Sequence, residues 1–196
     1  MNKLLCLSFL ASVAMVPGLA KAETLPTPVI AIVEQATLDK SDALKSIVSQ
    51  VDKKRAEIQK EMAKYESELK AQDKKLADEQ KSLPEKEFAD KRQAFEKRVR
   101  EIQEKIEIRR AQMELAVEDS KKKVYEAFLK VADKVAKNAG ANIVMYKETI
   151  VTAEPAYDLS AAALTELNTT LPTVPVVFKP EAEVKKILKQ QAEAQQ

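Results

Sequence analysis

A highly charged stretch at residues 41–139 constrains this 196-residue chain most, because it contains no glycine and a single proline, Pro84. Glycine and proline weaken a helix interior more than other residues, so their scarcity predicts long helices on both sides of Pro84. Apolar residues recur at three- and four-residue steps in both halves, which indicates two amphipathic helices packed together. The stretch therefore predicts an antiparallel helical hairpin over residues 41–138, with its tip near residues 81–86.

The apolar positions assign a seam to each helix. With Val51 at heptad position a, the seam of the first helix is Val51, Ile58, Met62, Tyr65, Leu69, Leu76 and Leu83. The stripe of the second helix comprises Phe88, Phe95, Val99, Ile102, Ile106, Met113, Val117, Val124, Phe128, Val131 and Val135. At about 100° per residue, Ile108 and Leu115 point almost opposite to the seam residues Ile106 and Met113. They are either exposed contact residues or the beginning of a packed body.

Capping residues mark the ends of both helices. Ser41 is the expected N-cap of the first helix. Ser82 and Glu85 have the spacing of a capping box, with Pro84 in the first turn of the second helix. Gly140 is the expected left-handed C-cap. These residues predict a new helix start at the tip and a second helix that runs further into the base than the first.

Short segments around the hairpin predict a small β-rich body made of residues 23–40 and 139–178. Residues 29–33 form a continuous apolar, β-branched run that is typical of a buried strand. Strands are also expected at 142–146 and 149–152, joined by a short turn. A helix capped by 158–160 is expected to run to Leu167. An extended proline-containing segment at 171–178 and a polar, mobile tail at 179–196 are expected to follow.

Residues 1–22 have the pattern of an export signal. Lys3 precedes an apolar run that ends at Val16 and is too short to span a bilayer, and residues 20–22 form a small-x-small cleavage site. We expect cleavage after Ala22 and a periplasmic product. Because the signal holds two of the 33 basic residues (Lys3 and Lys21) and none of the 31 acidic ones, 33 − 2 = 31 basic residues would remain and the mature chain would be formally neutral.

The composition argues against catalysis. The sequence has no histidine, and its one cysteine, Cys6, lies in the signal segment, so no Ser-His or Cys-His nucleophile pair can form. Gly140 is the only glycine after residue 22, which excludes a glycine-rich phosphate loop. We therefore expect no catalytic, cofactor-binding or metal-binding residues. An enzyme that relies on metal or carboxylates alone is the alternative.

Basic clusters at residues 53–55, 109–110 and 121–123 alternate with acidic residues. A formally neutral chain with few aromatic residues does not fit nucleic-acid binding. Plain solubility is the simplest interpretation, and the functional alternatives are steering of acidic unfolded clients and contact with anionic lipid headgroups.

The body also predicts self-association. Three strands at most are marginal on their own and leave two open edges. Several chains could close a larger sheet and remove those edges.

The order of these segments resembles the OmpH/Skp family of periplasmic chaperones. The resemblance is carried by residues 29–33, the charged hairpin, residues 142–145 and the capped helix at 158–167. It implies an α+β, mostly α fold in which a long antiparallel coiled-coil hairpin projects from a small β body completed by oligomerisation, as a jellyfish-like homotrimer. It also implies an ATP-independent holdase that binds unfolded outer-membrane proteins between helical tentacles. Formal neutrality and the extension after Val177 depart from the family.

Two sets of residues follow from this interpretation. The client-contact candidates are Leu83, Phe88, Ile108 and Leu115. The oligomerisation candidates are Val29, Ile30, Ile32, Val33, Tyr125, Leu129, Ile143 and Val144. The alternative function is a structural coiled-coil spacer or adaptor of the cell envelope that docks through its apolar tip.

Overall fold

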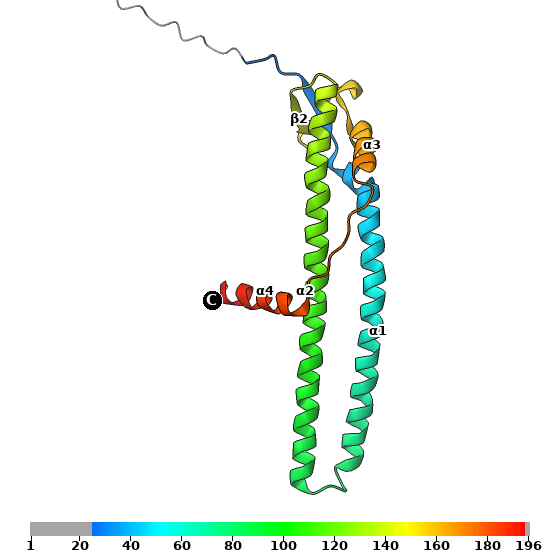
Figure 1. Ribbon diagram of the computed structural model, residues 1–196, viewed down its shortest axis with the longest axis vertical. Coiled ribbons are helices and arrows are strands. Elements are labelled where there is room, and N and C mark those ends of the chain that lie inside the picture. The colour runs from blue at the N-terminus through cyan, green and yellow to red at the C-terminus, as the bar shows by residue number, and fades with distance from the viewer. Residues whose placement is uncertain (1–24, 195–196) are drawn as a thin grey trace, which may run out of the picture.

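The computed structural model describes residues 25–194, so the expected export signal lies outside the described residues. The elements follow in the order β1 (Ile30–Val33), η1 (Gln35–Lys40), α1 (Asp42–Glu79), α2 (Glu85–Asn138), β2 (Ile143–Tyr146), η2 (Lys147–Thr149), η3 (Pro155–Tyr157), α3 (Ser160–Thr170) and α4 (Glu181–Ala194). Figure 1 shows α1 and α2 as a long antiparallel pair, with β1, β2 and α3 gathered at the end opposite the tip. The expected α+β, mostly α fold is confirmed. We call β1, η1, β2, η2, η3, α3 and the bases of α1 and α2 the body.

The two hairpin helices differ in length as expected. α1 has 38 residues and α2 has 54, which correspond to about 57 and about 81 Å. Ser41 caps α1, because its buried hydroxyl accepts a hydrogen bond from the Leu44 N–H at 3.3 Å. This N-cap was predicted correctly.

Gly140 ends α2 in the left-handed region, with φ +78°. Its N–H donates to the Lys137 carbonyl at 3.0 Å, and the Ala141 N–H donates to the Ala136 carbonyl at 2.9 Å. This pair of bonds is the Schellman motif, which satisfies carbonyls that the helix end would otherwise leave free. The predicted left-handed cap is confirmed.

The capping box predicted at Ser82 and Glu85 is wrong. The N–H and the hydroxyl of Ser82 both donate to the Glu79 carbonyl, at 3.1 and 3.2 Å. Pro84 is the N-cap of α2 and makes no side-chain capping bond. Ser82 therefore satisfies a carbonyl at the C-terminal end of α1 and does not cap the N-terminus of α2. The last carbonyls of a helix also need hydrogen-bond donors.

The sheet has two parallel strands, with Ile30 opposite Ile143 and Val33 opposite Tyr146. The strand predicted at residues 149–152 does not form. Lys147–Thr149 instead make a 3-10 turn that Ile150 closes by donating to the Lys147 carbonyl at 3.1 Å. The free edge of β1 is taken by residues 158–159, since the Leu159 N–H donates to the Ile32 carbonyl at 2.8 Å. The outer edge of β2 has no partner among residues 25–194.

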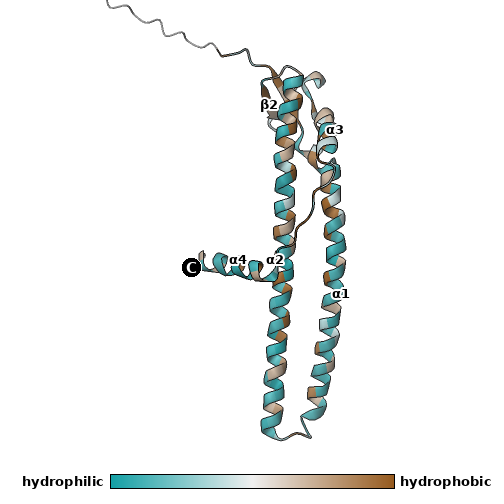
Figure 2. Ribbon diagram, in the orientation of Figure 1, coloured by the Kyte–Doolittle hydropathy of each residue, from teal (hydrophilic) through white to brown (hydrophobic). Residues whose placement is uncertain are grey.

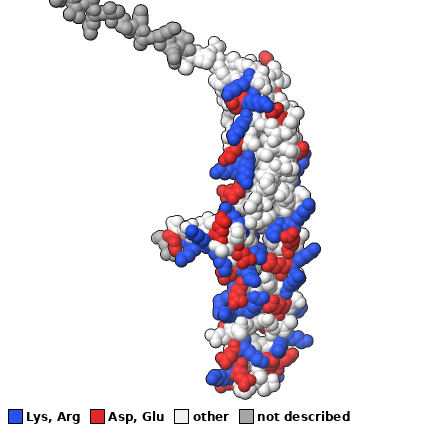
Figure 3. Space-filling model, in the orientation of Figure 1, with Lys and Arg blue, Asp and Glu red and all other residues white. Residues whose placement is uncertain are grey.

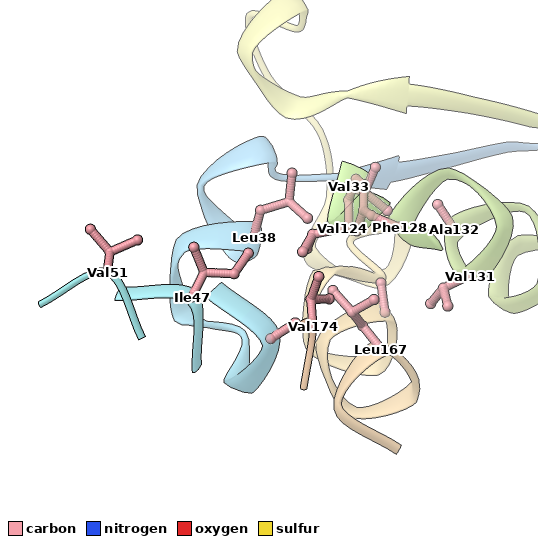
Figure 4. Packing of buried hydrophobic residues seen from close by; sticks show 12 residues of the cluster. Val33, Leu38, Ile47, Val51, Val124, Phe128, Val131, Ala132, Leu167 and Val174 are labelled. Atoms are coloured by element: carbon pink, nitrogen blue, oxygen red, sulfur yellow. The ribbon is translucent and has the colours of Figure 1, made fainter. Parts of the chain in front are cut away.

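The main core lies where the body meets the base of the hairpin. Phe128 of α2 is fully buried and packs with residues from β1, α1 and α3. Figure 4 shows Val33, Val124 and Phe128 close together, with Leu167 and Val174 nearby. Residues from both ends of the chain thus contribute to one apolar cluster.

The C-terminal part of the chain packs along the hairpin. Residues 171–180, which we call the strap, run as an extended trace from α3 to α4 (Figure 1). The extended segment expected at 171–178 lies within the strap. α4 follows, and Val184 in its first turns is fully buried. The segment expected as a polar tail is therefore helical over Glu181–Ala194, and its mobility stays a prediction.

Candidate oligomerisation and client surfaces

Several apolar side chains of the body are exposed in the single chain. They are Val29, Ile30, Tyr125, Leu129, Ile143, Val144 and Met145. Leu129, Val144 and Met145 line a hollow of about 460 Å³ between α2 and β2, and Met145 also lines a second hollow beside β1. Figure 2 shows hydrophobic residues concentrated at this end of the molecule. Apolar side chains around an open strand edge are a surface suited to a second protein chain.

Two of the predicted oligomerisation residues do not lie on this surface. Ile32 and Val33 are 4% and 3% exposed and belong to the interior of the chain itself. Val33 packs in the main core with Phe128. Both side chains are therefore covered within the single chain, and their part in the oligomerisation body stays a prediction. The other six candidates are exposed, and their role also stays a prediction.

Polar contacts fix the loop that flanks β2. The Tyr125 and Tyr146 hydroxyls lie 3.0 Å apart, and burial together with this hydrogen bond raises the pKa of Tyr146 to about 12. Asp158 accepts from the Ser160 N–H at 2.9 Å and pairs with Lys147 at 2.9 Å. Hydrogen bonds from Ser160 and Lys147 lower the pKa of Asp158 to about 2. Asp158 therefore joins the turn after β2 to the start of α3.

Bidentate ion pairs join the two helices of the hairpin above the body. Arg98 donates to Glu68 at 2.7 and 2.9 Å, and Arg109 donates to Glu61 at 2.9 and 3.2 Å. These hydrogen bonds lower the pKa of both carboxyls and raise the pKa of both guanidinium groups. The Tyr65 ring lies between two cations of α2, 5.6 Å from Arg98 and 5.4 Å from Lys105. In contrast, α1 fully buries apolar side chains only near its base.

The four client-contact candidates lie in different surroundings. Leu83, Phe88 and Leu115 are partly exposed, the first two at or near the tip. Ile108 is 2% exposed, whereas its expected seam neighbour Ile106 is 45% exposed. Of the two alternatives left open for Ile108, exposure is therefore excluded, and the seam passes on its side of α2. The role of the four residues in client binding remains a prediction.

The cover over Ile108 explains its burial. On the same face of α2, Glu104 pairs with Lys185 of α4 at 2.8 Å, and Gln112 donates to the Lys179 carbonyl. Ile108 lies one turn from each, so the end of the strap and the start of α4 pass over it. No sequence pattern indicated this contact, because Gln112 is polar and residues 179–196 were expected to be a mobile tail.

Four of the eight residues in the basic clusters at 53–55, 109–110 and 121–123 are paired with acidic residues of the chain. Lys54 and Arg55 pair with acidic residues one turn away, and Arg109 and Arg110 are paired as well. Figure 3 shows Lys and Arg intermixed with Asp and Glu over the hairpin. Across residues 25–194, no group of three or more His, Cys, Asp or Glu residues could hold a metal ion. No helix in this range is long and apolar enough to cross a membrane.

This fold defines a class of proteins in which a long helical hairpin projects from a small α/β body. The model of the family described as outer membrane protein (OmpH-like) matches residues 29–167, so this chain belongs to the OmpH-like family. The matched range ends before the strap and α4.

A solved structure supports the fold independently. A protein from Caulobacter crescentus CB15, described as an OmpH-like outer membrane chaperone, matches with a TM-score of 0.73 and 14% sequence identity. The match covers 80% of this chain and 94% of that one. At this identity the likeness concerns the fold alone. No curated protein matches the chain.

Proposed function

We propose that this protein is a non-enzymatic, ATP-independent periplasmic holdase that binds unfolded outer-membrane proteins and prevents their aggregation. One observation carries the proposal: a long hairpin with partly exposed apolar side chains among balanced charges projects from a body with an uncovered apolar surface. Membership of the OmpH-like family and the fold shared with an OmpH-like outer membrane chaperone support it.

The body is the proposed oligomerisation unit, and a homotrimer is the proposed state. The outer edge of β2 is unpaired in the part of the chain that the structure describes. Ile143 and Val144 on this strand are exposed, and exposed Leu129 lines a hollow together with Val144. Unpaired strand edges and apolar side chains are both costly in water, and association removes both. Several hairpins leaving one assembled body would enclose a client cavity.

The hairpin is the proposed client-binding element. Leu83, Phe88 and Leu115 each offer a partly exposed apolar side chain, so each contact with a client is weak. Many weak contacts on several linked hairpins give avidity while each contact still exchanges. The intermixed charges would speed capture at low salt more than they set the final affinity. Anionic lipid headgroups are a second proposed partner for the basic residues that remain exposed.

A shortened hairpin tests this proposal while preserving the body. Deleting residues 66–79 and 85–98 removes two heptads from each helix, so the remaining helices keep their facing register and the tip turn at 80–84. The deletion leaves the Glu61–Arg109 pair, the main core and the strap in place. A urea-unfolded outer-membrane β-barrel protein is diluted into buffer, and light scattering reports its aggregation.

The shortened protein is expected to keep the number of chains of the full-length oligomer but to suppress aggregation at least several-fold less well per chain. A matched control is the full-length Ser82→Ala variant, which changes the tip without shortening the hairpin. Equal suppression by the shortened and full-length proteins would refute the tentacle mechanism and favour the spacer alternative.

A further inference from the structure

Side chains of the hairpin form hydrogen bonds with the backbone of the strap. Gln50 of α1 donates to the Val174 carbonyl at 2.8 Å and accepts from the Val176 N–H at 3.0 Å. The Val174 N–H donates to the Ser46 hydroxyl at 3.2 Å, and Gln112 of α2 donates to the Lys179 carbonyl. Side-chain amides and hydroxyls that form hydrogen bonds with peptide groups recognise the backbone conformation of a bound segment and not its amino-acid sequence.

The spacing of these contacts matches that of an extended polypeptide segment. Ser46, Gln50 and Lys54 lie one turn apart on α1, and the Lys54 ammonium lies 5.6 Å from the centre of the Phe178 ring. One helical turn of four residues advances about 6 Å, and two extended residues advance about 6.6 Å. Alternate strap residues therefore meet successive turns of α1.

Side chains of the strap alternate between the hairpin and solvent. Val174 is buried in the main core and Val176 packs against it, whereas Val177 is 60% exposed. Exposure along the strap thus has a period of two, and the side chains that face the hairpin are apolar. A membrane β-barrel strand has apolar side chains at every second residue, so its apolar face matches the side of the strap that the groove covers.

Gln112 is held in an orientation that suits hydrogen bonding to the backbone of the strap. Its side chain is 8% exposed, and Arg109 donates to its Oε1 atom at 3.0 Å, which leaves the amide nitrogen directed at the strap. Arg109 also pairs with Glu181 at 2.7 Å at the start of α4. Beyond its first turns, α4 leaves the hairpin in Figure 1. The strap and α4 are therefore anchored at a few points along one line.

We propose that the groove between α1 and α2 that holds residues 174–179 is a binding site for extended, alternating apolar segments of unfolded clients, and that the strap occupies it as a tethered competitor. The client assignment rests on the proposed holdase function, whereas competition for the groove does not. Intramolecular tethering gives the strap a high effective concentration, so a client gains the groove only when its several contacts outweigh the strap.

The test opens the groove without altering it. Val176→Pro removes the N–H that donates a hydrogen bond to the Gln50 Oε1 atom. Val184→Asp places a charge at a buried position of α4. The matched control carries Val177→Pro and Gln190→Asp, the same new residues at exposed positions. A fluorescent synthetic peptide with the sequence of residues 171–188 serves as the probe.

The opened variant is expected to bind the peptide at least tenfold more tightly than the wild type or the control. Adding Gln50→Ala and Gln112→Ala to the opened variant should abolish that gain, because the groove itself is then altered. Hydrogen exchange over residues 174–188 verifies that the strap is released while α2 stays protected. Strap release without a gain in peptide binding would overturn the inference. If α2 loses protection in the opened variant, a milder variant carrying Val176→Pro alone is measured instead. Unchanged peptide binding by that milder variant would also overturn the inference.

Client binding supplies the second readout. An unfolded outer-membrane β-barrel protein should displace the peptide, and the opened variant should suppress its aggregation at a several-fold lower concentration than the control does. Suppression that is equal in all variants, with no displacement of the peptide, would overturn the groove as a client site while the holdase function stands. A failure of every variant to suppress aggregation would overturn the holdase function and the client assignment together, even if the peptide binds.

Discussion

Leu129→Ala tests whether the exposed apolar surface of the body is where chains associate. Leu129 lies on α2 beside the hollow next to β2 and is 46% exposed in the single chain. Burying a whole leucine side chain stabilises by about 1.5–3 kcal/mol, so covering its exposed part contributes about 1 kcal/mol. Three equivalent copies in a trimer give about 3 kcal/mol, which corresponds to about a hundredfold change in the association equilibrium.

Sedimentation velocity across a range of protein concentrations measures this shift. Ile106→Ala is the matched control, because Ile106 lies on the same helix and is 45% exposed but sits on the hairpin away from the body. Leu129→Ala should move the midpoint of dissociation to higher concentration, and Ile106→Ala should leave it unchanged. Equal effects of both substitutions, or no effect of Leu129→Ala, would refute the assignment of this surface.

Three further predictions concern the stability of the chain. Ser41→Ala should lower the free energy of unfolding by about 1 kcal/mol, because Ser41 caps α1. Ser82→Ala at the exposed tip should lower it by less than about 0.5 kcal/mol. Urea titration of both variants compares the two values. Gly140→Ala should cost about 1–2 kcal/mol through backbone strain alone, since no atom lies within 4 Å of the added Cβ; thermal unfolding measures it. Asp158 has its pKa lowered to about 2 from an ordinary 3.8, so it stabilises the fold above about pH 4, and up to about 2 kcal/mol is lost as the pH falls through 2. Asp158→Asn should flatten that loss in urea titrations at pH 2, 4 and 7.

Backbone chemistry made most of the fold predictable. The absence of glycine and of all but one proline over residues 41–139 predicted the two helices, and Ser41 and Gly140 predicted two of their ends. The β-branched run at 29–33 predicted β1. Each of these signals is local, because one residue or one short run determines its own backbone conformation.

The phase of the seam on α2 was harder to predict: Ile106, a predicted seam residue, is 45% exposed, and Ile108 is buried in its place. The buried row on α2 advances in steps of four: Ile108, Gln112, Ala116, Ser120, Val124, Phe128, Ala132 and Ala136. A hydrophobic stripe identifies the apolar members of such a row and passes over its polar and small members. A strict seven-residue repeat also drifts by about 20° per heptad on a straight helix, so a phase set at one end is lost over a long one.

Contacts between segments far apart in the sequence account for the remaining misses. Ser46, Gln50 and Gln112 look like ordinary solvated helix residues until the strap is placed against them. The edge of β1 is another example, since residues 158–159 occupy it. Neither partner can be recognised from the local pattern of the segment that it binds.

The two ends of the hairpin are held by different forces, and this difference suits the proposed function. Near the body, Ile47 and Val51 of α1 pack with Phe128 in an apolar core that fixes the base of the hairpin. Further out, the helices meet through partly exposed ion pairs such as Glu68 with Arg98, and solvent screens the attraction within pairs of this kind. The distal hairpin can therefore exchange its own side-chain contacts for contacts with a client at little net cost, while the apolar base keeps the hairpin attached to the body.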